Sequence, residues 1–536
     1  MPEAKKSSMG KTASTVALLT ILSKLAGLAR DILVARAYGA TPLADAYNFA
    51  YMFTGNILIL FGGLGGPFHS ATVVTLEPKK NDPDSGVLIA QILVATGVIL
   101  FLIATIVFVL APYLLHWQAG NYGSAGHIAD RDVFFQQATL QLRWMSPLIV
   151  LSGLIGVTYG VLNVFNRIFW PSMSPAIASA AIIIALLVFP NPDSSLPLAI
   201  GSLIGAFGQL FAQLPDMFRC NLNYKFSLKA SPELRNYVSV LWPAFVGTSI
   251  GQILLYIDAS FAASCETGAW TAVMNANRLI QLPLGVLITA ILVPILPRFT
   301  ERAAADKPEE VKQEFFRALK FLLFISFPLT MVLIVLGKPI IQSLFQRGQW
   351  TDYATDLVTI VLLYLAPSIV IYIGRDLITR VFYAYKDSKT PYYVGMAAIV
   401  VKYFLDFSFV YQLKMGVAGI ALATSLITIF NFTCLSVLLR RKIGPLGMTT
   451  MIKPVLIMLV ASVVAGFGTH FAFAVAIALL AKATAFLHLI ALLGTIGAAS
   501  AIGMIIYTGI TILCKLEEPT LLMQRLKLLP KDKTGQ

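Results

Sequence analysis

The stretch "SKLAGLARDILVARAYGA", Ser23 to Ala40, combines the apolar pattern of a long helix with charged side chains. Lys24 and Asp31 are seven residues apart and share a helix face, and Arg30 lies about 100° round from Asp31. Arg36, near the end of the stretch, can reach water by extending its side chain. An ionisable group inside a spanning helix costs about 2.5–3.5 kcal/mol and usually faces a bundle interior or a water-filled cavity. The stretch therefore predicts a membrane helix that lines a polar interior.

The rest of the chain has the composition of a membrane protein. It has 536 residues, of which 57% are hydrophobic and 12% are charged, whereas soluble domains average about 25% charged residues. Apolar runs long enough to cross a bilayer recur along the whole length. We expect an all-α polytopic membrane protein with about 14 transmembrane helices. The expected spans are 14–38, 43–75, 87–115, 134–160, 170–189, 197–219, 236–263, 270–297, 314–336, 355–384, 391–412, 416–439, 451–479 and 484–514.

The positive charge of the chain sets its expected orientation. The formal net charge of +14 would suggest nucleic acid in a soluble protein. Here Lys and Arg collect on one side of the expected spans by roughly five to one, which is typical of cytoplasmic loops. We therefore expect both termini in the cytoplasm and no nucleic-acid partner.

Motifs for chemistry or for nucleotide hydrolysis are missing from the sequence. None of the four cysteines forms a CxxC pair, and neither HExxH nor GxxxxGK[ST] occurs. We expect no metal site, no cofactor and no enzyme activity. Any transport would then be driven by membrane potential, by an ion gradient or by consumption of the product.

Further charges fall inside the expected spans. Arg278 lies in span 270–297 beside Asn275 and Asn277. Arginines buried without an acid would indicate an anionic guest, since the planar guanidinium donates parallel hydrogen bonds to phosphate. Internal ion pairing is the alternative reading. We favour the guest for Arg30 and Arg278, and internal pairing for Lys402 and Asp406, which are four residues apart on one helix face.

A glycine run interrupts the second expected span, in "LFGGLGGPFHS". Gly62, Gly63, Gly65 and Gly66 would bend or break a helix in mid-membrane, where irregular backbone needs protein or a cavity beside it. The run indicates either a hinge in the transport path or close packing through small residues. The sequence does not decide between them. Weak similarity between the two halves also suggests six helices plus six, a common transporter plan.

Several ordered motifs resemble those of one family, the MurJ (MviN) lipid II flippases of the multidrug/oligosaccharidyl-lipid/polysaccharide exporter superfamily. The motifs are "SKLAGLARDILVARAYGA…ADAY", "LNVFNR…P…SP", "NRLIQLPLGVL…ILVPILPRF", "LFQRGQW" and "FYAYKDSKTP". The similarity runs from about residue 14 to about residue 440 in the right order.

The resemblance implies two six-helix lobes around a central cavity and two C-terminal helices that form a lipid-facing groove. The implied segments are a cytoplasmic tail (1–13), an N-lobe (14–222), a C-lobe (223–440), the groove helices (441–515) and a second cytoplasmic tail (516–536). It implies a flippase in the bacterial cytoplasmic (inner) membrane that moves lipid II, an undecaprenyl-diphosphate glycopeptide, to the outer leaflet by alternating access. Membrane lipids and peptidoglycan-synthesis proteins are the other implied partners.

The resemblance also assigns roles to residues. Arg30 and Arg278 match cavity arginines that engage the diphosphate, and Lys24 keeps a charge that is often arginine. Asp31 and Asp45 match functionally important acids. We place these two acids, the two asparagines and the four glycines of the second span at the cavity or its gates.

Two departures from the family pattern indicate a divergent branch, for which we expect a cyanobacterial source. The second span lacks the family's Arg-Arg pair and its glutamate, with Ile59-Leu60 and Leu64 in those places, and Gln281 replaces an acid. Some members bind sodium through an Asn four residues before an Asp. Here Lys402 precedes Asp406, and its ammonium group could stand in for the ion.

Two other transporter classes remain as alternatives. A flippase for another polyprenyl-linked glycan, or a drug exporter, would have the same fold. Cavities of drug exporters tend to be acidic or aromatic, so we rank these alternatives lower. A polytopic glycosyltransferase would need a large outer loop with paired acids, which the sequence lacks.

Overall fold

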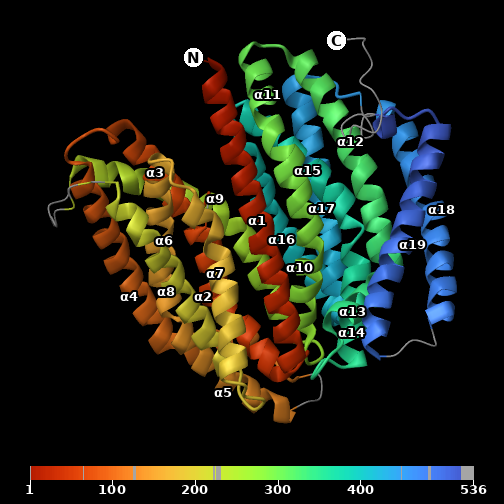
Figure 1. The fold of residues 1–536 in the computed structure, drawn as a ribbon, viewed down its shortest axis with the longest axis horizontal. Helices are drawn as coiled ribbons and strands as arrows, with labels where there is room; N and C mark the ends of the chain where they lie inside the picture. Colours follow the sequence, from red (N-terminus) through yellow and green to blue (C-terminus); the bar gives the residue numbers. More distant parts are fainter. Residues whose placement is uncertain are drawn as a thin grey trace. The chain divides into compact units, whose positions relative to one another are not determined.

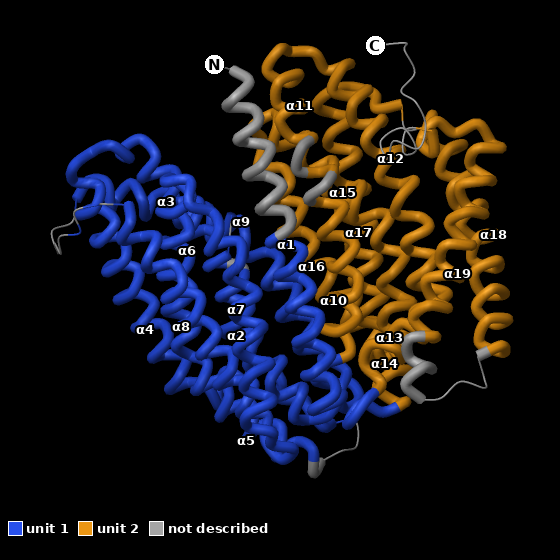
Figure 2. The backbone as a smooth tube through the Cα atoms, viewed as in Figure 1, with its two compact units in different colours: residues 1–271, 347–351 blue, residues 272–346, 352–536 orange. Residues whose placement is uncertain are grey.

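The computed structural model describes residues 2–63, 65–124, 128–220, 222, 224, 231–447, 449–480 and 485–520. All regular structure in these ranges is helical, as expected (Figure 1). The chain divides into two compact units (Figure 2). Unit 1 contains residues 1–271 and 347–351, and unit 2 contains residues 272–346 and 352–536. The expected lobes, 14–222 and 223–440, stay a prediction.

Unit 1 is a bundle in which α7 packs along α8 and α1, while α6 contacts α2, α3, α4 and α8. Its helices are α1 (Pro2–Tyr38), α2 (Pro42–Gly62), α3 (Pro67–Leu76), the 3-10 turn η1 (Glu77–Lys79), α4 (Ser85–Ala119), α5 (Ile128–Met145), α6 (Pro147–Val164), α7 (Phe169–Val188), α8 (Leu196–Phe218) and α9 (Pro232–Ala262). The first helix begins at Pro2, ahead of the expected start at residue 14.

Unit 2 is a second bundle in which α17 packs against α14, α15 and α16, and α12 contacts α15 and α18. Its helices are α10 (Ala269–Leu287), whose first turn belongs to unit 1, the π turn η2 (Ile288–Leu292), α11 (Val293–Ala304), α12 (Pro308–Val335), α13 (Gly337–Phe345), α14 (Asp352–Leu365), α15 (Ser368–Ala384), α16 (Lys389–Phe407), the π turn η3 (Ser408–Gln412), α17 (Val417–Ile443), α18 (Thr449–Leu480) and α19 (Ala485–Leu513). Residues 521–536 of the expected C-terminal tail lie outside the described residues.

Ten helices in the described ranges are long and apolar enough to cross a membrane, and the bent pair α14 and α15 would make an eleventh. The expected spans 14–38, 43–75 and 270–297 are not among them. The total of 14 spans therefore stays a prediction.

Exposed apolar side chains show which solvent surrounds the helices. Trp117 on α4, Phe467 on α18 and Leu513 on α19 are 74%, 75% and 82% exposed. Large apolar patches of this kind are rare on soluble monomers and are the normal outer surface of a protein in lipid.

Prolines and glycines mark where the helices begin and end. Pro42, Pro67 and Pro147 stand at the first turn of α2, α3 and α6, where the missing amide hydrogen costs nothing. Gly39 has a φ of +60° directly after α1, a left-handed conformation that glycine adopts without strain.

The glycine run breaks the second span, as its sequence predicts. α2 ends at Gly62, and α3 begins at Pro67 after a turn in which Gly65 has a φ of +81°. A Cβ on Gly65 would meet nothing within 4 Å, whereas one on Gly62 would lie 2.5 Å from the Ser152 carbonyl oxygen on α6. Close packing is therefore confirmed at Gly62, whereas Gly65 is exposed and the hinge stays a prediction.

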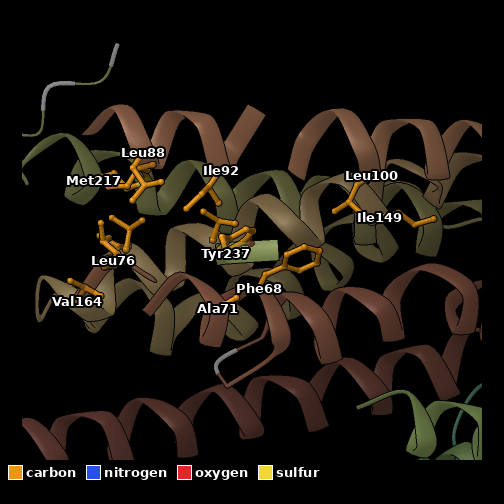
Figure 3. Close-up of a cluster of buried hydrophobic side chains, with 14 of the residues drawn as sticks. Phe68, Ala71, Leu76, Leu88, Ile92, Leu100, Ile149, Val164, Met217 and Tyr237 are labelled. Atoms are coloured by element: carbon orange, nitrogen blue, oxygen red, sulfur yellow. The ribbon is translucent and has the colours of Figure 1, made fainter. Parts of the chain in front are cut away.

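The short helix α3 is held by a buried apolar cluster in unit 1. Phe68, Ala71 and Leu76 of α3 pack with side chains from α4, α6, α8 and α9. Tyr237 of α9 lies beside Phe68 at the centre of this cluster (Figure 3). The position of α3 thus follows from burial of one face, and the turn before it carries the break.

Replacing Gly62 by Ala should lower the thermal unfolding temperature of the purified protein. The new methyl group would press against the backbone of Ser152, and overpacking costs about 1–3 kcal/mol. The control is Gly247→Ala in α9, where an added Cβ meets nothing within 4 Å. That variant should be unchanged or more stable, since Ala is about 1 kcal/mol better than Gly in a helix. Equal effects of the two changes would contradict a tight α2–α6 contact.

Candidate functional site

Asp45 is the most highly connected of the predicted site residues. It lies buried in the first turn of α2. Its Oδ1 accepts hydrogen bonds from the Thr271 amide (2.9 Å) and hydroxyl (2.7 Å). Its Oδ2 accepts from the Gly268 amide (2.8 Å) and the Tyr122 hydroxyl (2.9 Å). Since the first amides of a helix lack partners within it, the carboxylate caps the start of α10 from another helix.

Residues 347–351, here called the strap, cap the last turn of α1, the helix that precedes Asp45 in the sequence. The strap connects α13 to α14 but packs in unit 1. The Gln349 amide donates to the Arg36 carbonyl oxygen (2.9 Å). Gly39 and Gly348 both have positive φ, and a Cβ on either would overlap backbone of the other segment. Only glycine allows this approach.

Arg30 and Asp31 form an ion pair between adjacent residues of α1. Arg30 Nη2 and Nε lie 2.8 and 3.0 Å from Asp31 Oδ1. The two side chains are 20% and 9% exposed. The alternative reading placed the acid partner of Arg30 on a neighbouring helix, whereas the structure places it next in sequence. Asp31 contacts one edge of the guanidinium and thereby sets its orientation.

Lys24 lies on the same helix, about 10 Å along the axis from Asp31, and is half-buried. None of the described side chains forms an ion pair with it. Gly62, Gly63, Gly65 and Gly66 lie at the far end of α2 from Asp45, about 25 Å away at helical rise. The structure therefore separates Asp45 from the glycine run by the length of α2.

Arg278, Asn275 and Asn277 lie on α10 within unit 2. Asn275 is buried, and Arg278 Nη1 donates to its Oδ1 at 3.5 Å. The contact is long, so the amide orients the guanidinium without neutralising its charge.

Lys402 and Asp406 form a fully buried ion pair on α16 in unit 2. Their side chains are 1% and 0% exposed, and Lys402 Nζ lies 2.7 Å from Asp406 Oδ1. Lys402 also donates to the Ile420 carbonyl oxygen of α17 at 3.4 Å. A cation thus lies between a carboxylate and a backbone carbonyl, the ligand types that hard metal ions prefer.

Sequence reasoning missed His69 and the strap. His69 Nδ1 lies 3.2 Å from the Gly65 amide, and its Nε2 lies 2.9 Å from the Asn163 side chain of α6. The signal available in the sequence for the His69 contact was that His69 follows Gly65 by four residues. Most of the strap lies in the motif "LFQRGQW", but its contact with Arg36 had no local signal, because the two segments are far apart in the sequence.

The fold is similar to solved transporter structures. A structure titled "Lipid II flippase MurJ, inward closed conformation" matches with a TM-score of 0.75 and 23% identity, over 96% of this chain and 99% of that chain. An inward-facing multidrug resistance MATE transporter of the MOP superfamily matches with a TM-score of 0.65 and 15% identity, over 82% of this chain and 99% of that one. The protein is a multi-pass helical membrane protein with the fold of these two structures.

Sequence comparison defines the family. The family described as "Lipid II flippase MurJ" matches residues 34–512. A Synechocystis relative named "Probable lipid II flippase MurJ" is 31% identical over 83% of this chain and 84% of its own length. A Burkholderia cenocepacia relative named "Lipid II flippase MurJ" is 26% identical over 80% and 83%. The chain belongs to the lipid II flippase MurJ family.

Replacing Asp45 by Asn should lower the thermal unfolding temperature. The amide nitrogen would face a donor, Gly268 N–H or Thr271 N–H, and an unsatisfied buried group costs about 1–3 kcal/mol. Asp130→Asn is the control, because the Thr267 hydroxyl that donates to Asp130 (3.0 Å) can equally donate to an amide oxygen. A loss of stability no larger than that of the control would contradict the capping role.

Proposed function

We propose that this protein moves lipid II from the inner to the outer leaflet of the bacterial cytoplasmic membrane by alternating access. Membership of the MurJ family and the match to a MurJ fold support this cargo. Both termini would then lie in the cytoplasm, in keeping with the distribution of Lys and Arg. The cargo crosses without covalent change, so the protein is a transporter and not an enzyme.

The diphosphate of the cargo explains the charges on α1 and α10. A diphosphate head is too polar for the bilayer core, while the polyprenyl tail can stay in it. The observation that carries the proposal is the geometry of Arg30. Asp31 holds the Nε–Nη2 edge of its guanidinium, which leaves the Nη1 end to donate to phosphate oxygens. Lys24 supplies further positive charge on α1, and we propose that Arg278 of unit 2 also engages the diphosphate.

Asp31 and Asp45 have different parts in this mechanism. Asp31 keeps Arg30 oriented and lowers the cost of its burial while no cargo is bound. Asp45 acts at a gate, because its four hydrogen bonds join α2 to the start of α10. The glycine turn between α2 and α3 provides the hinge or the exposed backbone along the path. We also propose that α18 and α19 form the groove for the lipid tail.

Replacing Arg30 or Arg278 by Ala should reduce flipping by about tenfold or more, since hydrogen bonds to charged groups are worth about 1.5–3 kcal/mol. Arg36→Ala is the control on α1, as that side chain is exposed. The assay uses cells depleted of their own flippase and a membrane-impermeant toxin that degrades lipid II in the outer leaflet. Near-normal degradation with both variants would overturn the diphosphate role.

The same assay separates the alternatives. If wild-type protein inserts correctly but exposes no lipid II, the cargo is a different polyprenyl-linked glycan or a drug. The absence of the family's Arg-Arg pair and glutamate from the second span is the feature that favours this alternative. Proteins of peptidoglycan synthesis are expected partners only if lipid II is the cargo.

The proposed energy source rests on two features: the sequence has no nucleotide-binding motif, and Lys402 and Asp406 form a buried ion pair on α16. Without a nucleotide-binding motif, transport is driven by membrane potential, by an ion gradient or by removal of lipid II outside. We propose that Lys402 replaces sodium as the cation beside Asp406, so that sodium coupling is lost.

Flipping by the wild type should be equal in sodium-free and sodium-rich buffer. Lys402→Asn removes the internal cation and leaves Asp406 buried beside neutral groups, which is strongly unfavourable. Sodium should therefore raise the thermal stability and flipping of this variant. Lys414→Asn is the matched control at an exposed lysine and should not respond to sodium. Strict dependence of the wild type on sodium would contradict the replacement.

A further inference from the structure

His69 bridges the glycine turn of the second span and the neighbouring helix α6. Its Nδ1 lies 3.2 Å from the backbone nitrogen of Gly65, and its Nε2 lies 2.9 Å from the side-chain amide of Asn163. The Ser70 hydroxyl adds a contact with the Gly65 carbonyl oxygen (3.3 Å). His69 is thus the side chain that connects the exposed turn to the packed part of unit 1.

The hydrogen bonds allow one protonation state of the imidazole. The Gly65 amide can only donate, so Nδ1 must accept and carries no proton. A neutral ring then has its proton on Nε2, which donates to Asn163. Since the oxygen and nitrogen of an amide side chain are interchangeable in assignment, the Asn163 oxygen faces Nε2. An imidazolium would present a proton to the Gly65 amide and could not keep this contact.

The turn at Gly65 is less tightly packed than α3, because α3 itself is held by buried contacts. Phe68 and Ala71 of α3 lie in the buried apolar cluster (Figure 3). Gly160 of α6 approaches so closely that an added Cβ would lie 2.9 Å from the His69 carbonyl oxygen. In contrast, Gly65 is exposed, and a Cβ there would meet nothing within 4 Å. Losing the His69 contact would therefore free the turn while α3 stays in place.

Other titratable or charged groups lie on the elements packed against α3, and Tyr237 of α9 lies in its apolar cluster. Glu233 of α9 pairs with Lys79 of η1 (2.5 Å), and Lys80 donates to the Val164 carbonyl oxygen. The remaining titratable or charged side chains on the elements packed against α3 are Asp45, Tyr47 and Tyr51 on α2, Tyr159 on α6, Arg235, Tyr237, Tyr256 and Asp258 on α9, and Glu77 on η1.

We propose that His69 is a positioning residue for transport, which holds the Gly65 turn against α6 only while its imidazole is neutral. On this reading, protonation releases the turn and slows flipping, so that the rate depends on pH through one side chain. The inference rests on the proposed flippase function. It assigns the pH response to the second span and not to the arginines, which keep their charge throughout this range.

The test measures flipping of lipid II by purified protein in vesicles at several pH values. Histidine changes charge between about pH 5 and pH 8, so the wild-type rate should fall severalfold as the pH is lowered from about 7.5 to about 5. His69→Gln offers a carbonyl oxygen to Gly65 and an amide nitrogen to Asn163 without titrating. It should be active and should lose most of the pH dependence. His69→Ala should be slow at every pH.

His116→Gln is the matched control. His116 lies in unit 1 on α4, is exposed, and contacts the Pro112 carbonyl oxygen (2.8 Å) and the ring of Phe135. Its variant should keep the wild-type pH profile. A His69→Gln profile identical to that of the wild type would overturn the inference, as would an unchanged rate in His69→Ala.

A measurement independent of transport addresses the tautomer directly. Nitrogen-15 NMR of histidine-labelled protein should show a His69 ring with Nε2 protonated and Nδ1 bare at neutral pH. A proton on Nδ1 would overturn the assignment. If wild-type protein moves no lipid II at any pH while this NMR signature is present, the proposed function has failed and the His69 geometry has not.

Discussion

A charge buried in a membrane helix needs a partner, and in three pairs among the described residues the partner lies within the same helix. Arg30 pairs with Asp31, Arg380 with Asp376 (3.2 Å), and Lys402 with Asp406. Each of these pairs is close to neutral before any neighbouring helix is in place, which lowers the cost of inserting the helix. In each of these pairs the acid and the base belong to one helix, so the pair itself can stay together when neighbouring helices move. Intrahelical pairing therefore suits a protein that must change conformation while embedded in lipid.

Asp45 follows the opposite principle. Asp45 accepts four hydrogen bonds, which come from donors in the α4–α5 connection and at the start of α10. Its buried carboxylate therefore has its hydrogen-bond partners only when three segments that are distant in sequence meet. A carboxylate that accepts several hydrogen bonds at a helix N-terminus is a strong local constraint. Aspartate is thus used in two ways: in intrahelical pairs its partner is close in sequence, and at the Asp45 junction its partners are far away in sequence.

The sequence distance between a residue and its partners also explains which contacts could be predicted from the sequence. Length and hydropathy identified the apolar helices such as α4 and α12, the glycine run located the break after Gly62, and a spacing of four residues indicated the Lys402–Asp406 contact. Asp45 was singled out, but its partners Tyr122 and Thr271 are 77 and 226 positions away, and no local pattern encodes contacts at that range. His69 was missed for a related reason. Its importance depends on the φ of Gly65 and on Asn163, which only the folded turn brings together.

The strap has a consequence for biosynthesis. Unit 1 is built from the first half of the chain except for residues 347–351, which the ribosome delivers after nine helices of that unit and four of the next. Until then the Arg36 carbonyl at the end of α1 lacks the amide of Gln349, and Gly39 lacks its close approach to the Gln349 backbone. Domains usually fold as units in the order of their synthesis, but this one is completed late, by a peptide inserted from downstream. The helix that carries Arg30 is therefore among the first to be made and among the last to be capped.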